Sequence, residues 1–460
     1  MADLGTTHSC NASSGWQRHG RRAAALAALV SVIVGGTGAC RRNKPPVTAA
    51  GMGGAQAGSG GTSAGGGQAG SSGAAGAGGG VMDTGAWKAV PGGEPCGLAV
   101  ADVSKLGVPA RTWSSCGDGC SIASALTLPS DAAAATRNAS AAGTVGGEIY
   151  LRMTTGSPEY VLVVVTRLSD GKAIAAVKQT ASFSSCAPVA SQHAALAFPF
   201  ILPSGAGLLV GLARASDGAV TWSPIQSNLP INIQVMSNDL GWAIQLSDGT
   251  VRVLMPPTDA QLRTIDRGVL ATGQGGAVLD RMVWSTAVSG VDAEVIKGYT
   301  PAAGVLQLAA QDTDDHIVAL SDTAVAWIGT TGPRRHEGSY ETAQLFWAPW
   351  PDPLGPLSTR TGPLLPATNE LSSLKTWGDF AATIGCRNAL DTCELLVVKL
   401  STGKLWRIPR RPGAVFLDVM AISPGELLVD EIDYPSGHVQ EVQRLVRLDL
   451  TRLDVLEHAW

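Results

Sequence analysis

The chain has 460 residues, of which 45% are hydrophobic and 15% are charged, and its formal net charge at pH 7 is −4. That apolar content over this length is ample for a large buried core. Aromatic residues make up only 5% of the chain, so we expect a core built mainly from Val, Leu, Ile and Ala. No basic patch of the kind that binds phosphate backbones occurs, which excludes nucleic acid from the expected partners.

The first 39 residues have the order of a bacterial export signal. Three arginines precede an apolar run, residues 23–34, in which Ser31 is the only polar residue. A membrane-spanning helix needs about twenty apolar residues, whereas the core of a signal peptide needs about 7–15 behind a positive flank. We therefore expect residues 1–39 to be a signal peptide and the protein to be exported to the bacterial cell envelope.

The end of this segment resembles the lipobox of bacterial lipoproteins. Gly38 and Ala39 fill the two small positions before Cys40, and Thr37 stands where the family usually has Leu or Val. The resemblance implies that Cys40 becomes lipidated and anchors the protein to a membrane. Two alternatives stay open, namely ordinary cleavage after Ala39, which releases the chain, and an uncleaved N-terminal anchor.

A glycine-rich segment follows Cys40. Residues 51–80 include fifteen glycines and no charged residue. Such a composition cannot bury enough apolar surface to offset the entropy of ordering it. We therefore expect residues 40–92 to be a disordered tether and residues 93–460 to be the folded domain.

Six cysteines lie beyond Cys40, and an even number in an exported chain indicates disulfides. Cys386 ends one strand-like run and Cys393 begins the next, so in a hairpin the two would face each other within disulfide range. We predict this pair. The connectivity of the others is left open. A metal site on Cys116 and Cys120 is disfavoured, because their spacing is not that of a C-x-x-C knuckle and no histidine is near.

The folded region shows short apolar runs and almost no helical periodicity. Asp-Gly turn signals recur between the runs at residues 170–171, 217–218 and 248–249, and they favour tight antiparallel hairpins. Four strand candidates recur about every fifty residues in the last third of the chain, as in propeller blades. The predicted fold is all-β, a closed β-propeller of seven four-stranded blades over residues 106–460. A pair of β-sandwiches is the alternative.

This pattern resembles the large set of lipid-anchored or secreted bacterial β-propellers over most of residues 95–460. The Trp-Asp repeat of WD40 blades is absent, and residues 146–150 look like a single kelch strand. Residues 216–222 are similar to the Asp-box hairpin of sialidase-type propellers, and residues 401–406 echo it. In that family the box is a structural turn, and its Trp packs between blades.

Candidate chemical motifs are few, and we interpret each as structural. Ser372-Ser373-Leu374-Lys375 contains S-x-x-K, but the partner motifs of penicillin-recognising enzymes are missing. The carboxylates and His316 of residues 312–316 could hold Ca²⁺, but the loop lacks the features of an EF-hand. Residues 334–336 form a charged hairpin loop. Trp347 and Trp350 could form a ligand platform, although core packing is the favoured interpretation.

These observations predict no catalytic residue, no metal site and no cofactor, and His193, His438 and His458 show no ligand spacing. The leading functional hypothesis is a tethered binding scaffold for a protein or glycan ligand, which would sit at the central channel or on the loop-bearing face. The competing hypothesis is a hydrolase or lyase acting on an envelope or extracellular polymer. Acidic, Tyr and Arg residues converging at one channel mouth would favour the enzyme.

Overall fold

The computed structural model describes residues 87–105, 111–123, 139–157, 160–180, 187–188, 195–203, 207–225, 234–237, 242–245, 250–254, 263–267, 269–270, 275–287, 294–311, 317–330, 343–365, 370–371, 374–386, 393–433 and 442–459. All of them belong to one compact unit, Thr84–Trp460. The expected signal peptide, Cys40 and most of the tether lie outside the described residues. None of the helices in the described part of the chain is long and apolar enough to cross a membrane.

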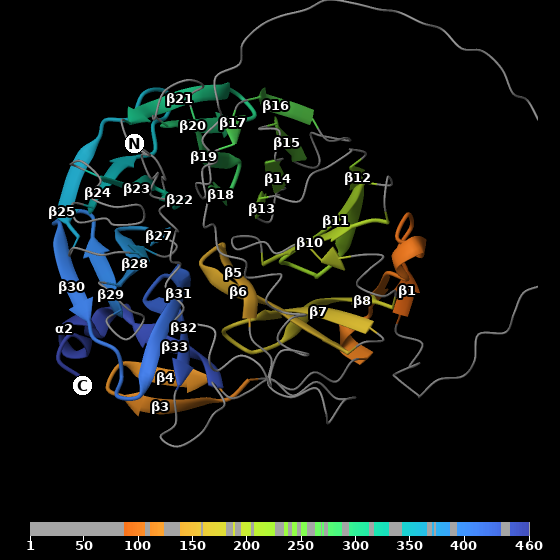
Figure 1. The fold of residues 1–460 in the computed structure, drawn as a ribbon, viewed down its shortest axis with the longest axis horizontal. Coiled ribbons are helices and arrows are strands. Elements are labelled where there is room, and N and C mark those ends of the chain that lie inside the picture. Colours follow the sequence, from red (N-terminus) through yellow and green to blue (C-terminus); the bar gives the residue numbers. More distant parts are fainter. Residues whose placement is uncertain are drawn as a thin grey trace, which may run out of the picture. The chain divides into compact units, whose positions relative to one another are not determined.

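The described strands form seven antiparallel sheets, numbered I to VII (Figure 1). Sheet I contains β1 (Trp87–Ala89), β2 (Ala99–Ala101), β5 (Ala139–Val145), β6 (Glu148–Ser157), β7 (Tyr160–Arg167) and β8 (Ala173–Gln179). Sheet II contains β9 (Ala187–Pro188), β10 (Ala197–Ile201), β11 (Leu208–Ala213) and β12 (Val220–Ile225). Sheet III contains β13 (Gln234–Ser237), β14 (Trp242–Gln245), β15 (Thr250–Leu254) and β16 (Arg263–Arg267).

The remaining sheets complete the succession. Sheet IV contains β17 (Val269–Leu270), β18 (Gly276–Val278), β19 (Arg281–Ala287), β20 (Glu294–Thr300) and β21 (Gly304–Gln311). Sheet V contains β22 (Ile317–Leu320), β23 (Ala324–Thr330), β24 (Ala343–Pro349) and β25 (Arg360–Leu364). Sheet VI contains β26 (Glu370–Leu371), β27 (Lys375–Trp377), β28 (Phe380–Cys386), β29 (Cys393–Lys399) and β30 (Lys404–Ile408). Sheet VII contains β3 (Trp113–Gly117), β4 (Cys120–Ala123), β31 (Ala414–Ser423), β32 (Glu426–Asp433) and β33 (Val442–Asp449).

Short helical turns connect or end these strands. They are the 3₁₀ turns η1 (Glu94–Cys96), η2 (Val103–Lys105) and η4 (Leu450–Arg452), and the helical turn α2 (Leu453–Leu456). The all-β propeller fold is therefore confirmed. Equal four-stranded blades are wrong in detail, because the sheets have four, five or six strands. The tether boundary at residue 92 is also wrong, since β1 already pairs with β2 from Trp87 onward.

Neighbouring sheets pack through their own hydrophobic clusters. Separate buried clusters join sheets I and II, III and IV, IV and V, V and VI, VI and VII, and VII and I. Strands β10 and β13 bring sheets II and III into contact. Valine, leucine, isoleucine and alanine dominate these clusters, as the low aromatic content predicts. Sheets I, IV, V, VI and VII each take part in two such clusters and so bury both faces, which is why several of their strands are continuously apolar.

Sheet VII is assembled from both ends of the folded unit. Strand β4 pairs antiparallel with β33, with Ile122 opposite Val446 and Cys120 opposite Leu448. The amide of Asp449 also donates to the carbonyl of Gly119 over 2.9 Å. The contacts between the two ends thus use the β3–β4 hairpin, which begins at Trp113.

The Asp-Gly turn signals mark equivalent hairpins in sheets I and II. Gly171 and Gly218 adopt positive φ in the turns that join β7 to β8 and β11 to β12, and Gly403 does so between β29 and β30. An added Cβ at Gly218 would lie 1.7 Å from the carbonyl oxygen of Ile174. The third predicted turn, residues 248–249, lies outside the described residues, between two strands that are central in sheet III.

Candidate functional site

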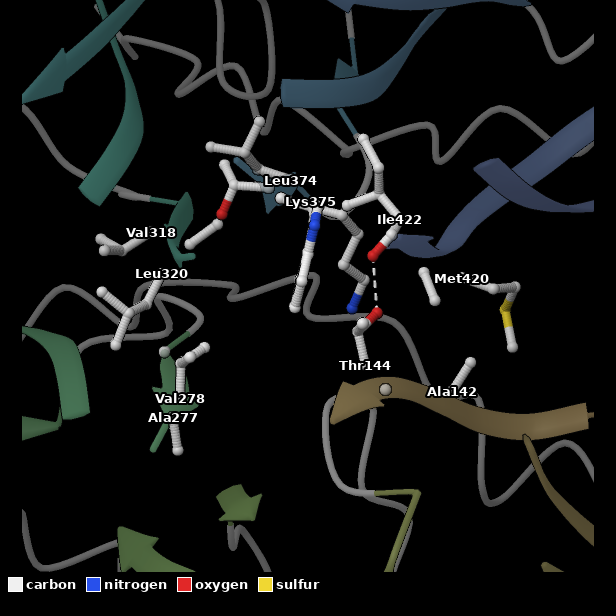
Figure 2. Close-up of a pocket in the computed structure, with 17 residues that line it drawn as sticks. Ala142, Thr144, Ala277, Val278, Val318, Leu320, Leu374, Lys375, Met420 and Ile422 are labelled. Carbon is white, nitrogen blue, oxygen red and sulfur yellow. Dashed lines mark hydrogen bonds between the residues drawn. The ribbon is translucent and has the colours of Figure 1, made fainter. Parts of the chain in front are cut away.

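A small pocket lies where the inner strands of five sheets meet. It has a volume of about 80 Å³, which is room for a few water molecules or one small ligand. Strands β5, β18, β22, β27 and β31 supply its walls, and neighbouring inner strands are in contact from β18 through β22, β27 and β31 to β5. The pocket therefore lies between the inner strands of five of the seven sheets (Figure 2).

Small and apolar residues line most of this pocket. Gly276 allows β18 to approach β22 closely, because a Cβ there would lie 3.0 Å from the backbone nitrogen of Leu320. The hydroxyl of Thr144 donates to the carbonyl of Ile422 over 2.6 Å, which ties β5 to β31. Lys375 is the only charged residue in the lining. Figure 2 shows its side chain extending into the pocket toward Thr144.

The amine of Lys375 is electrostatically perturbed. Burial removes water from the ammonium form and lowers the pKa of Lys375 from 10.5 to about 8, whereas the nearby carboxylate of Asp418 acts in the opposite direction. Desolvation is the larger effect. The channel thus contains an amine that is neutral for a sizeable fraction of the time near neutral pH.

Carboxylates surround the end of the channel at which the pocket lies. Each of the five lining strands runs directly into a tight turn. Asp280, Asp322 and Asp379 lie in these turns, and Glu148, Arg281 and Glu426 begin the strands that follow them. Several of these groups hold turns together. Glu148 accepts from the amide of Ser169 over 3.1 Å, and Asp322 accepts from the amide of Gly378 over 3.3 Å. Asp379 accepts from the amide of Ser401 over 2.6 Å. The acidic rim is therefore partly structural.

The disulfides match the sequence prediction where one was made. Cys386 and Cys393 form a disulfide with Cα atoms 4.0 Å apart, directly opposite each other on β28 and β29. Cys116 and Cys120 form a second disulfide, so their thiolates are not available as metal ligands. Cys96 is also disulfide-bonded. Within the described residues, no group of three or more His, Cys, Asp or Glu side chains could hold a metal ion.

The aromatic candidates are structural. Trp350 is 9% exposed within the cluster that joins sheets IV and V, with the guanidinium of Arg281 5.5 Å from its ring centre. Arg360 covers Trp347 in the same way at 4.7 Å. The favoured interpretation, core packing, is confirmed for Trp350. Neither ring forms an open platform, because a cation lies over each.

The two Asp-box-like tryptophans lie on outer strands. Trp222 on β12 packs against Phe198 and Phe200, each with ring centres 6.4 Å away. Trp406 on β30 packs against Phe380 at the same separation, and its indole nitrogen donates to Asp454. Both residues follow a positive-φ glycine turn by a few positions. They stabilise the packing of sheets, as the resemblance implies.

Several predicted candidates lie outside the described residues. These are Cys40, His193, the cluster of residues 312–316, residues 334–336, Ser372 and His438. His458 is described, and it lies in the exposed C-terminal segment. Lys375 belonged to the S-x-x-K pattern, but the sequence did not indicate that it lines a channel. The available signal was a lone lysine in a short segment that is otherwise uncharged.

No protein family model and no curated protein matches this chain. Solved β-propellers resemble it weakly. The β-propeller domain of the Trilobed protease from Pyrococcus furiosus is 7% identical, with 68% of this chain and 93% of that chain covered and a TM-score of 0.43. BamB from Moraxella catarrhalis is 12% identical, with 79% and 99% covered and a TM-score of 0.40. The Neurospora crassa Pan2 WD40 domain is 10% identical, with 74% and 97% covered and a TM-score of 0.42. The fold class therefore rests on the sheets of this chain.

Proposed function

We propose that this protein is a binding scaffold of the bacterial cell envelope, which engages a protein or glycan ligand at the mouth of its central channel. The pocket at the turn-bearing end of the channel is the observation that carries the proposal. It combines apolar walls with one amine, which is the composition of a small-ligand site. A ligand that inserts one small group there would be held on a rigid β framework.

The scaffold is proposed to be a closed ring in which the antiparallel sheets act as blades. The hydrogen bonds between β4 and β33 and the clusters between neighbouring sheets support closure. Closure would leave no sheet face exposed between blades, so the channel would keep its shape when a ligand binds. It would also remove interior sheet edges that could pair with other chains.

A hydrolase or lyase is the second candidate, because carboxylates do gather at the channel mouth. The hydrogen bonds described above give three of them, Glu148, Asp322 and Asp379, a role in holding turns. An acid or base in a reaction needs its oxygens directed toward substrate. The scaffold is therefore the function that this geometry supports better.

The proposed location is the envelope, with a lipid on Cys40 holding the protein to a membrane through the glycine-rich tether. The disulfides of the folded unit support an oxidising compartment. Metabolic labelling with a fatty acid should mark the wild-type chain and spare Cys40→Ala. Equal labelling of both chains would contradict the anchor.

Channel binding is tested by filling the pocket. Ligand-observed NMR with a set of small neutral and charged fragments should detect binding to the folded protein. Ala277→Leu, which fills the lining, should abolish that binding. Val455→Leu, at a position 41% exposed on α2, should leave it unchanged. Fragment binding that survives in both variants would place the ligand elsewhere.

A further inference from the structure

The charges of the inner strands suggest what the pocket accepts. Across β5, β18, β22, β27 and β31, only two residues are charged, Lys375 and Asp418. Strand β28, which pairs with β27, carries no charge. The charged groups that these strands place near the amine thus include one carboxylate, that of Asp418, while most residues of the lining are apolar.

This arrangement disfavours charged ligands of either sign. An anion would lose its hydration in a pocket lined mostly by apolar residues, and Asp418, outside the lining, lies close enough to the amine to affect its pKa. A cation would meet the ammonium form of Lys375. Moving an ion of either sign from water into such a pocket costs hydration free energy, so both classes are disfavoured more than at an open surface. An uncharged small molecule is the remaining class.

The amine of Lys375 is also neutral, and therefore nucleophilic, in part of the molecules at pH 7. At pH 7, a pKa of about 8 leaves roughly one amine in ten neutral, which is roughly 300-fold more than for a lysine at 10.5. A desolvated lysine in an apolar pocket is the standard activated amine nucleophile for carbonyl compounds. The cavity of about 80 Å³ limits the carbonyl compound to a few heavy atoms.

We propose that the channel pocket captures a small uncharged aldehyde or ketone as an imine on Nζ of Lys375, an inference that rests on the proposed binding function. The lone pair of neutral Nζ attacks the carbonyl carbon, and a proton passes from nitrogen to the former carbonyl oxygen. The C–O bond then breaks and one water leaves, which gives the C=N bond without any oxidant or reductant. The protonated imine is positive, and Asp418 is its counter-ion. Of the S-x-x-K pattern, only Lys375 takes part in this step.

The test is reductive trapping on the folded, oxidised protein. The protein is incubated at pH 7 with propionaldehyde and dimethylamine borane, an uncharged reductant that the pocket does not disfavour, and modified lysines are identified by peptide mass mapping. Lys375 should be alkylated at least about 10-fold faster than exposed Lys172, because burial lowers the pKa of Lys375 and the pocket holds the aldehyde beside its amine. A parallel incubation with glyceraldehyde, a small sugar, shows whether the pocket also accepts polar carbonyl compounds. The apolar lining favours faster trapping of propionaldehyde. Equal rates at the two lysines would overturn the proposal.

Matched probes separate this inference from the broader function. An excess of 1-propanol, an uncharged molecule of similar size, should slow trapping at Lys375 by competition, and sodium propionate should not. Binding of 1-propanol without any trapping at Lys375 would overturn the imine and leave the channel as a binding site. Failure of every probe to bind or react would overturn the proposed function as well. Lys375→Met should remove the trapped product, and Lys172→Met should leave it. If a variant does not fold, the relative rates at Lys375 and Lys172 in the wild-type peptide map decide the test.

Discussion

Sheets VI and VII are neighbours with five strands each, but their strands come from the chain in different ways. All strands of sheet VI come from one continuous stretch, β26 to β30, joined by short connections. Sheet VII takes β31–β33 from the C-terminal end and the β3–β4 hairpin from more than 300 residues earlier. The two sheets share one buried hydrophobic cluster, so sheet VI provides the surface on which the strands of sheet VII pack.

The contacts of the two sheets reflect this origin. Sheet VI is stabilised by a disulfide between adjacent strands and by the ion pair of Arg407 with Glu394. Sheet VII depends on contacts across the length of the chain, such as Arg447 to Ser121 and Arg452 to Asp118. Bringing such distant segments together costs loop-closure entropy before any contact forms. Sheet VII should therefore be the more vulnerable of the two.

The largest effect should follow truncation after Leu450. The deletion removes Leu453 and Leu456, which are 2% and 0% exposed, together with the contacts of α2 to β30. Losing two buried leucines should cost about 5 kcal/mol or more, comparable with the whole stability of a typical domain. We expect aggregation on size-exclusion chromatography. A truncated chain that stays monomeric with unchanged melting would count strongly against closure through sheet VII.

A single substitution tests the same contact more gently. Leu456→Ala should lower the free energy of unfolding by about 2–5 kcal/mol, because it leaves a cavity beneath α2. Val455→Ala is the matched control, since Val455 is 41% exposed and should cost less than about 0.5 kcal/mol. Denaturant titration measures both. Equal costs would show that α2 does not secure the composite sheet.

Removing the disulfides compares the two hairpins directly. Cys386→Ala with Cys393→Ala opens a seven-residue separation, and Cys116→Ala with Cys120→Ala opens one of four. Chain-entropy estimates give about 2 kcal/mol for each pair, slightly more for the longer loop. Urea titration of the two double variants measures the losses. A much larger loss for the second pair would show that its disulfide orders the docking hairpin beyond closing a loop.

The same contrast explains how far sequence reasoning could go. The apolar run that begins at Tyr160 and the Asp-Gly turn at Asp170 became β7 and its hairpin, because a short apolar run next to a turn signal is a local feature of the sequence. The pairing of Ile122 with Val446 has no local signal, since it depends on how the rest of the chain closes. Strand β18 is only three small residues, so no periodicity marked it.

The channel pocket could not be predicted from the sequence, for the same physical reason. Its walls come from five strands of five sheets, and only their combined register places Lys375 opposite Thr144 and near Asp418. By contrast, the Cys386–Cys393 disulfide was predictable, because both cysteines belong to one hairpin. Local pairs could be predicted from their neighbours in sequence, and sites between sheets could not.

The smallest effect concerns the boundary between the two sheets, where Lys375 of sheet VI lies near Asp418 of sheet VII. Burial lowers the pKa of Lys375 from 10.5 to about 8, so between these values the unfolded chain binds more protons than the folded one. Stability therefore rises with pH across this window, as the folded state is relieved of a buried ammonium. We expect a gain on the order of 1 kcal/mol between pH 7.5 and pH 9.5 in the wild type relative to Lys375→Met. Urea titrations at the two pH values measure this difference, and Lys172→Met controls for the loss of a lysine elsewhere. Parallel pH dependences in wild type and Lys375→Met would mean that the amine is as well solvated in the channel as in the unfolded chain.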